Sequence, residues 1–144
     1  MKKIQVCSGS LVEWIYWMAV DVLRSFKWDI EYRYVYIDRK ERVIDVRKRP
    51  VSEKLADRYK RLDACVEPEE EKIFISPDAE DKALCLFHEC LEILFDDWRG
   101  EYFVPKRWGL KKGEDPILNL EAATWEKLSR AQKNTIKWYL PKGP

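Results

Sequence analysis

The only histidine in this 144-residue chain stands beside two glutamates at a spacing that can bind a metal ion. His88, Glu89 and Glu92 are the only strongly polar residues in the otherwise apolar segment from Ala83 to Phe95. On a helix, positions 88 and 92 lie one turn apart and face the same way, so an imidazole and a carboxylate can bind the same ion. Glu89, next to them, can poise a water molecule as a general base. The segment therefore predicts a metal centre that activates water.

A simpler interpretation of the same pattern is a polar stripe on a helix. Cys85, His88, Glu92 and Asp96 recur at three- and four-residue steps, and such a stripe can face solvent or pair with Lys and Arg side chains. With about one residue in ten being Glu, a glutamate at both positions after a single histidine also arises by chance. The neighbouring elements therefore have to decide between the two interpretations.

The elements expected around this motif are a strand before it and a helix after it. Lys72 to Asp78 predicts a strand that runs through a short acidic turn into the motif helix, with the strand spanning Glu71–Ser76. Pro77 and Asp78 open that helix, which we expect to continue to Trp98. Residues 99–116 predict a loop rich in Gly and Pro, and Pro116 starts a last helix to about Leu140 that carries Glu121 on a largely apolar face.

The first half of the chain predicts a helix and a hairpin. Apolar residues recur at helical spacing after Ser10, which we expect to cap a helix through about Phe26. The other expected elements are a strand at Ile30–Ile37, a charged turn at Asp38–Arg42, a returning strand at Val43–Val46 and a short basic helix from Ser52 to Leu62. No repeat or Gly/Ser linker divides the chain, so residues 1–144 are expected to form one α+β domain.

The order of strand, motif helix, loop and Glu-bearing helix resembles that of the minimal zincins. These are small gluzincin-like peptidases of the ImmA/IrrE type and their short phage-encoded relatives, some of which have H-E-x-x-E in place of H-E-x-x-H. The likeness covers roughly residues 30–128, and its specific part is residues 72–96 and 117–128. It implies a small zincin-like domain with an N-terminal helix, a short mostly antiparallel sheet, a motif helix and a C-terminal helix.

The resemblance also implies roles for individual residues. His88 matches the first metal ligand and Glu92 occupies the position of the second, while Glu89 matches the general base. In that family the third ligand comes from the helix after the loop, where Glu121 is the best candidate. The competing candidates for this third position are Glu114, Asp115 and Glu126. An extended peptide substrate would then lie along the edge of the strand at Ile73–Ile75.

The carboxylate at position 92 changes the expected chemistry. One neutral imidazole and two carboxylates leave a divalent ion with almost no net charge, so bound water is acidified less than in a site with two histidines. Oxygen-rich ligation shifts the preference from zinc, the first expectation, toward harder ions such as manganese. The alternative to a metal-dependent peptidase is therefore a catalytically degenerate zincin, of a phage type, that acts as a protein-interaction module.

The positions of the cysteines in the sequence suggest an alternative metal site. Cys85 and Cys90 flank His88, and Cys65 precedes the adjacent strand. On a helix Cys85 and Cys90 point about 140° apart, so they cannot both face one ion. We therefore expect buried, reduced thiols.

Charge is unevenly distributed, although the whole chain has a net charge of only +1. Residues 39–62 hold ten basic and four acidic residues, and residues 63–101 hold three basic and thirteen acidic residues. The basic hairpin at 39–49 could bind nucleic acid, but a solvated hairpin is the simpler interpretation. Among seven tryptophans, those at 14, 17 and 125 suit a core, and those at 98, 108 and 138 are freer to contact a partner.

Composition favours a cytoplasmic protein. No segment approaches the roughly 18 uninterrupted apolar residues of a membrane span. Glu13 and Asp21 interrupt the apolar stretch near the N-terminus, which argues against a signal peptide. Only two Asn and two Gln accompany abundant charged residues, a mildly thermophile-like bias.

Overall fold

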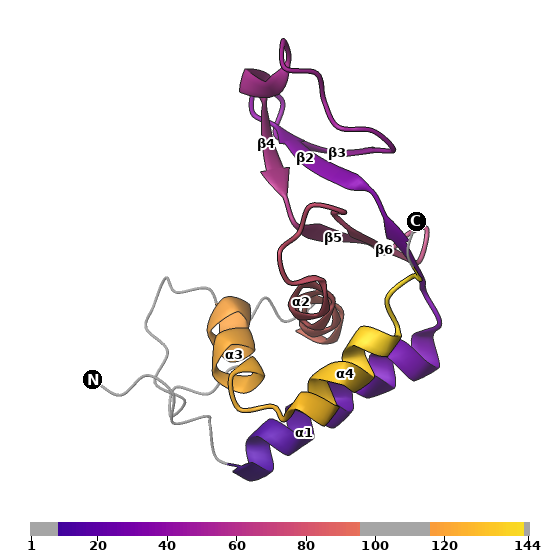
Figure 1. Cartoon of the computed structure of the whole chain (residues 1–144), viewed down its shortest axis with the longest axis vertical. Coiled ribbons are helices and arrows are strands. Elements are labelled where there is room, and N and C mark those ends of the chain that lie inside the picture. The colour runs from indigo at the N-terminus through magenta and orange to yellow at the C-terminus, as the bar shows by residue number, and fades with distance from the viewer. Residues whose placement is uncertain (1–8, 96–115, 143–144) are drawn as a thin grey trace, which may run out of the picture.

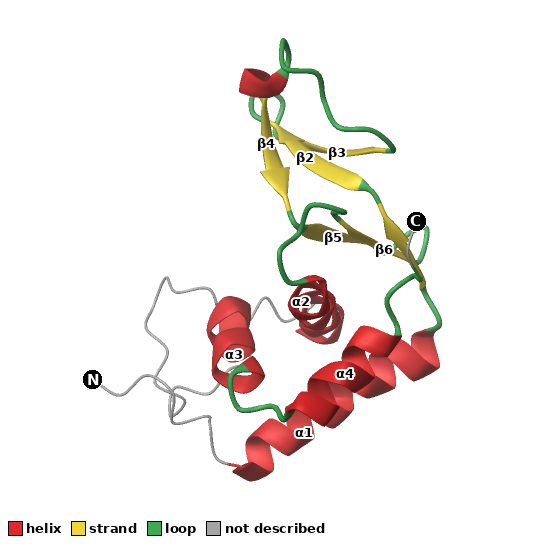
Figure 2. Cartoon of the chain, viewed as in Figure 1, coloured by secondary structure: helices red, strands yellow, loops and turns green. Residues whose placement is uncertain are grey.

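A computed structural model describes residues 9–95 and 116–142 of the chain, which form the predicted α+β fold with an N-terminal helix (Figures 1 and 2). The helices are α1 (Gly9–Asp21), which continues as the π-helical turn η2 (Val22–Phe26), the short 3-10 turn η3 (Ala56–Arg58), α2 (Lys82–Phe95), α3 (Pro116–Trp125) and α4 (Arg130–Trp138). The strands are β1 (Asp29–Tyr32), β2 (Tyr34–Asp38), β3 (Val43–Arg47), β4 (Tyr59–Leu62), β5 (Ala64–Glu67) and β6 (Lys72–Ile75).

The strands form two three-stranded sheets that share two long extended segments. β2 pairs with β3 and β4 in the order β3-β2-β4, whereas β6 lies between β1 and β5 in the order β1-β6-β5. β1 continues directly into β2, and β4 continues directly into β5. The two long segments pair with each other through β2 and β4. Beyond that pairing they separate, and β6 lies between β1 and β5. Only the β1–β6 pairing is parallel, which confirms a mostly antiparallel arrangement.

The sheet of β2, β3 and β4 forms an arm, defined here as residues 34–62. In Figure 1 it extends away from the labelled helices, which lie around β5 and β6. The β2–β3 hairpin confirms the predicted turn and returning strand, with Ile37 opposite Ile44. The predicted strand at Ile30–Ile37 is divided at Arg33 into β1 and β2, which belong to different sheets. On the arm, Tyr36 and Tyr59 pack edge to face with ring centroids 5.8 Å apart, and the Arg47 guanidinium lies 5.0 Å from the centre of the Tyr59 ring.

The core forms where α2 packs against the sheet of β1, β6 and β5 and against the other helices. Leu86, Phe87 and Leu91 of α2 are fully buried, and so are Ile73 and Ile75 of β6. This follows from the apolar character of both segments, because a helix that is apolar nearly all round must be covered on several sides. No helix in the described part of the chain is long and apolar enough to cross a membrane.

The predicted basic helix at 52–62 is wrong. Only Ala56–Arg58 is helical, and Tyr59–Leu62 is strand β4, paired antiparallel with β2. Leu62 and Val35 are opposite each other in this pairing, so the strand places apolar side chains together that a short isolated helix would leave exposed. Strand β5 at Ala64–Glu67 was also not predicted. It follows directly after β4 and pairs antiparallel with β6.

Three helix boundaries also differ from prediction. α1 begins at Gly9, so Ser10 lies within the helix and is not its cap. α2 begins at Lys82, because the Asp81 carboxylate accepts a hydrogen bond from the Leu84 backbone N–H at 3.1 Å and so acts as the N-cap. The predicted last helix is broken into α3 and α4. Ser129 caps α4 through a reciprocal pair of hydrogen bonds with Gln132, which begins a new helix.

The tryptophan predictions are partly wrong. Trp14 and Trp17 were expected in the core, yet they are 48% and 52% exposed on the outer side of α1. Trp125 does pack against the core, and Trp138 is exposed as expected. Trp98 and Trp108 lie outside the described residues. The predicted loop at 99–116 also lies outside them, apart from Pro116, which begins α3.

Candidate functional site

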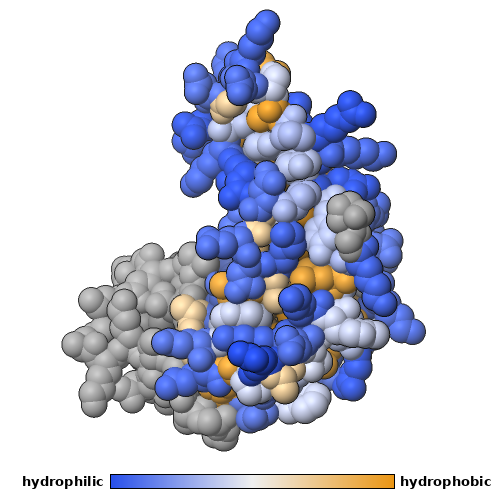
Figure 3. All heavy atoms as spheres, viewed as in Figure 1, coloured by the Kyte–Doolittle hydropathy of each residue, from blue (hydrophilic) through white to orange (hydrophobic). Residues whose placement is uncertain are grey.

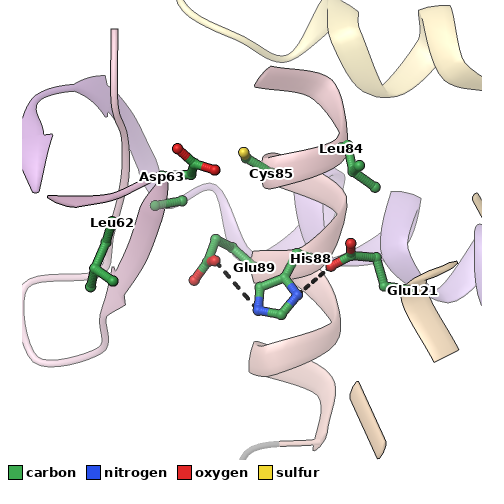
Figure 4. Close-up of a pocket in the computed structure, with 8 residues that line it drawn as sticks. Leu62, Asp63, Leu84, Cys85, His88, Glu89 and Glu121 are labelled. Atoms are coloured by element: carbon green, nitrogen blue, oxygen red, sulfur yellow. Dashed lines mark hydrogen bonds and ion pairs between the residues drawn. The ribbon is translucent and has the colours of Figure 1, made fainter. Parts of the chain in front are cut away.

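Helices α2 and α3 and the β4–β5 junction bring the candidate residues together around one imidazole (Figure 4). His88 and Glu89 come from the middle of α2, and Glu121 reaches His88 from α3, 33 positions away in the sequence. The predicted neighbours His88, Glu89, Glu92 and Glu121 are therefore all found in one place. The Phe87 and Trp125 rings, 5.4 Å apart, hold α2 and α3 against each other beside this site.

The two nitrogens of His88 have different carboxylate partners. Glu121 contacts Nδ1 through Oε1, while Glu92 Oε1 lies 3.5 Å from Nε2. Glu89 Oε2 is also on the Nε2 side, 3.9 Å away. The prediction that Glu121 lies near His88 is confirmed, but in this arrangement it binds the nitrogen opposite to the one that Glu92 faces. Its role as third ligand stays a prediction.

Glu89 is a buried carboxylate with little to stabilise its charge. Its side chain is 7% exposed, and no described residue donates a hydrogen bond to it. Burial, together with the charges of Glu92 and Glu121, raises the pKa of Glu89 from 4.5 to about 7, against the opposing effect of His88. A buried carboxylate that no described residue hydrogen-bonds, and whose nearest cation is His88 at 3.9 Å, calls for an explanation, which an ion, a water molecule or a catalytic role can supply.

His88 has the opposite environment. Burial by itself lowers its pKa, but the contacts with Glu121 and Glu92 and the charge of Glu89 outweigh burial and raise the pKa from 6.5 to about 10. The imidazole is therefore protonated at neutral pH in this arrangement. A proton on His88 balances part of the negative charge of the three surrounding glutamates, which is the same task that a bound cation would perform.

Nε2 of His88 and Oε1 of Glu92 are spaced like two ligands of one metal ion. Two ligands of a tetrahedral zinc ion, each bound at about 2.1 Å, are about 3.4 Å apart, and the Nε2–Glu92 distance of 3.5 Å matches this separation. Among the described residues, however, no group of three or more His, Cys, Asp and Glu side chains lies where it could hold a metal ion. Two donors thus fit a shared ion, and a third would have to move.

The site opens into a cavity of about 270 Å³. Leu62, Asp63 and Ala64 form its wall on the β4–β5 side, and Leu84 and Cys85 belong to the α2 wall (Figure 4). Asp63 was missed by the sequence reasoning. It lies at the junction of two strands of which neither was predicted, and its carboxylate pairs with Arg61 at 3.2 Å. Only the correct strand assignment would have indicated it.

The structure does not place the other predicted ligand candidates at His88. Glu126 is exposed just beyond the end of α3, whereas Glu121 is turned to His88. Glu114 and Asp115 lie outside the described residues. Cys65, Cys85 and Cys90 are free thiols. Burial raises the pKa of Cys65 and of Cys85 to about 12, so both are protonated and poor nucleophiles near neutral pH.

No protein-family model, curated protein or solved structure matches this chain. The resemblance to minimal zincins therefore remains a prediction.

The two shifted groups at this site predict how the metal-free protein responds to pH. The raised pKa of His88 contributes stability below pH 6.5 that is lost as the pH rises toward about 10. The raised pKa of Glu89 acts in the same direction between pH 4.5 and about 7, because the folded state holds its proton more tightly. We expect the free energy of unfolding to fall steadily from about pH 5 to about pH 9.

Urea unfolding with EDTA present measures this dependence. Glu89→Gln should flatten the part below about pH 7 and also reduce the fall above it, because the charge of Glu89 contributes to the raised pKa of His88. A free energy of unfolding that rises over the same range would contradict the assignment of both groups.

Proposed function

We propose that this chain is a zincin-like metalloprotein in which His88 and Glu92 hold a divalent ion, zinc first and manganese second, and that it hydrolyses peptides. The observation that carries the proposal is the buried Glu89 carboxylate, to which no described residue donates a hydrogen bond, beside an Nε2–Glu92 pair with the spacing of two ligands. When bound, the ion would supply Lewis-acid polarisation of a peptide carbonyl and of water.

The residues of the chain prepare the site for that chemistry. In neutral His88, the Nδ1–H donates to Glu121, which selects the tautomer whose Nε2 lone pair points toward Glu92. Glu121 thus orients the imidazole in this arrangement, and it becomes a ligand only by releasing Nδ1. Glu89, with its pKa raised to about 7, can accept a proton from water and donate it to a leaving amine.

An edge strand next to the cavity supports a peptide substrate. The expected edge at Ile73–Ile75 is wrong, since β6 is paired on both sides. β5 is one of the two edge strands of this sheet, and it is the one beside the cavity. The backbone C=O of Asp63 accepts a hydrogen bond from the N–H of Ser76 at 2.7 Å, which shows which residues of β5 are hydrogen-bonded to β6. The backbone groups of Ala64 and Val66 then point away from β6, so an extended peptide can pair with them. Ala64 also lines the cavity.

The composition of the cavity wall indicates which side chain would enter it. Leu62, Ala64 and Leu84 are apolar, and the neutral thiol of Cys85 lies beside them. An apolar substrate side chain would therefore be preferred next to the reacting carbonyl.

The second candidate function is that of a catalytically degenerate zincin that binds a protein partner without hydrolysing it. The observation in its favour is the direct contact of His88 with Glu121, in which a proton on the imidazole can replace the ion. The two candidates differ in whether the purified chain binds metal.

Metal titration of the dialysed protein tests the proposal. We expect one equivalent of zinc per chain, with an affinity that weakens up to tenfold for each pH unit below neutrality, because His88 must lose its proton to bind. His88→Ala and Glu92→Ala should each weaken binding by more than about 100-fold, and Glu121→Gln by about 10–100-fold if it acts only on the imidazole.

Glu126→Ala is the matched control, because Glu126 is an exposed glutamate close to Glu121 that does not contact His88. It should leave the affinity unchanged. Less than a tenth of an equivalent bound at about pH 8 would overturn the metal centre and favour the degenerate interaction module.

A further inference from the structure

The arm carries a dense set of positive charges that the site does not use. Residues 39–62 have a net charge of +6, with ten basic residues, and the arm projects from the body of the fold (Figures 1 and 3). Its visible face is mostly hydrophilic (Figure 3). The candidate site, by contrast, is lined by carboxylates, so positive and negative charge are separated in space.

Most of these cations have no acidic partner within the described part of the chain. Ion pairs involve Arg47 with Asp45 and Arg61 with Asp63, and a longer contact of 4.0 Å joins Arg58 to Asp38. The other seven basic side chains of the arm are exposed, and no ion pair with a described residue involves them: Arg39, Lys40, Arg42, Lys48, Arg49, Lys54 and Lys60.

The β2–β3 turn holds three of these cations on a defined backbone. The buried Asp38 carboxylate accepts hydrogen bonds from the backbone N–H groups of Lys40 and Glu41, at 3.0 and 3.3 Å. The Arg42 N–H donates to Asp38 O at 2.6 Å, which closes the turn. Arg42 has a φ of 56°, a left-handed conformation that glycine or asparagine adopts with less strain. The turn thus keeps a cation where the backbone alone would favour glycine.

We propose that the arm is a docking surface for the phosphate backbone of double-stranded nucleic acid. A duplex presents a regular array of negative charges, and exposed Lys and Arg side chains bind it by releasing counterions. The carboxylates of the candidate site repel the duplex, which confines binding to the arm.

The side chains of the arm favour a duplex over other polyanions. Of its three tyrosines, Tyr36 is buried, Tyr59 is covered by Arg47 and Tyr34 is half-buried, so the arm offers no row of exposed aromatic rings on which single-stranded bases could stack. Its exposed large apolar residues are Val43, Ile44 and Val46. The absence of an exposed Trp, Tyr or Phe on the described arm argues against a protein hot spot or insertion into a lipid surface.

Fluorescence anisotropy with a labelled mixed-sequence duplex tests the proposal, with EDTA present so that the metal centre has no influence. Wild-type affinity should fall steeply between about 50 and 200 mM KCl. The triple variant Arg39→Gln/Lys40→Gln/Arg42→Gln should bind at least about 10-fold more weakly at the lower salt, and its log–log salt slope should be smaller by about 2–3.

The matched control is Lys127→Gln/Arg130→Gln/Lys137→Gln, which removes the same charge from exposed positions outside the arm. It should change the affinity by less than about 3-fold. Arg42→Gly provides a variant whose fold is secure: its melting temperature should be retained or raised, while the salt slope falls by about 1.

Three results would overturn the proposal. The first is an equal loss of affinity in the arm and control triple variants. The second is wild-type binding that does not depend on salt. The third is tighter binding to poly-glutamate, to single-stranded DNA or to phosphatidylserine vesicles than to the duplex, which would assign the arm to another partner.

Discussion

Glu89→Gln is expected to lower peptide hydrolysis by at least about 100-fold and, at the same time, to stabilise the metal-free fold near pH 8. The loss follows because an amide cannot accept a proton from water. The gain follows because the Glu89 carboxylate must ionise in a buried place where its pKa is raised to about 7. The substitution should therefore add on the order of 1 kcal/mol to the free energy of unfolding, since a buried neutral amide is less unfavourable than a buried charge.

Peptide turnover and urea unfolding of the same preparation check both halves of this prediction. Metal stoichiometry should remain that of the wild type, because Glu89 is not assigned as a ligand. Glu126→Gln makes the same chemical change at an exposed position and should alter neither quantity. Turnover that survives in Glu89→Gln would exclude this residue as the base, and a less stable variant would show that the carboxylate has a partner outside the described residues.

Phe87→Ala is expected to have the largest effect on stability. Phe87 is fully buried in the core cluster, and its ring packs 5.4 Å from that of Trp125. Removal of the ring leaves a cavity between α2 and α3, and truncations of this kind destabilise a fold by about 3–5 kcal/mol. Denaturant unfolding in EDTA measures the change, and Phe87→Leu should recover much of it by refilling the space.

Trp138→Ala is the control for this prediction, because Trp138 is 70% exposed and its removal should change the free energy of unfolding by less than about 1 kcal/mol. A small effect of Phe87→Ala would mean that α3 is not held on α2 in the way described. The same contact positions Glu121 beside His88, so Phe87→Ala should also weaken zinc binding.

The members of the candidate site were largely predictable, whereas their contacts were not. The helical spacing of His88 and Glu92 places both on one face, and the apolar helix after the loop supplies Glu121. Which nitrogen of His88 each carboxylate meets depends on how α2 and α3 pack. That packing put Glu121 on Nδ1 and Glu92 on the Nε2 side, a distinction that no local pattern contains.

The fold errors have a common cause, which is pairing between distant segments. Tyr59–Leu62 has no strong local preference and became strand β4 because β2 offered it an edge. Ala64–Glu67 likewise became β5 on the free side of β6, which moved the expected substrate edge from β6 to β5. Local signals were sufficient where capping or turn chemistry decides the structure, as at the β2–β3 turn.

The sequence by itself determined the chemistry available to this protein: one imidazole, neighbouring carboxylates at helical spacing, and a separate cationic hairpin. These depend on residue type and on short-range periodicity, which are properties of the chain alone. Only the tertiary structure decided that Glu89 is buried without a hydrogen bond from a described residue and that β5, beside the cavity, is an edge strand of the described sheet. Burial and strand order come from contacts between residues far apart in the chain, and such contacts form only when the whole core is assembled.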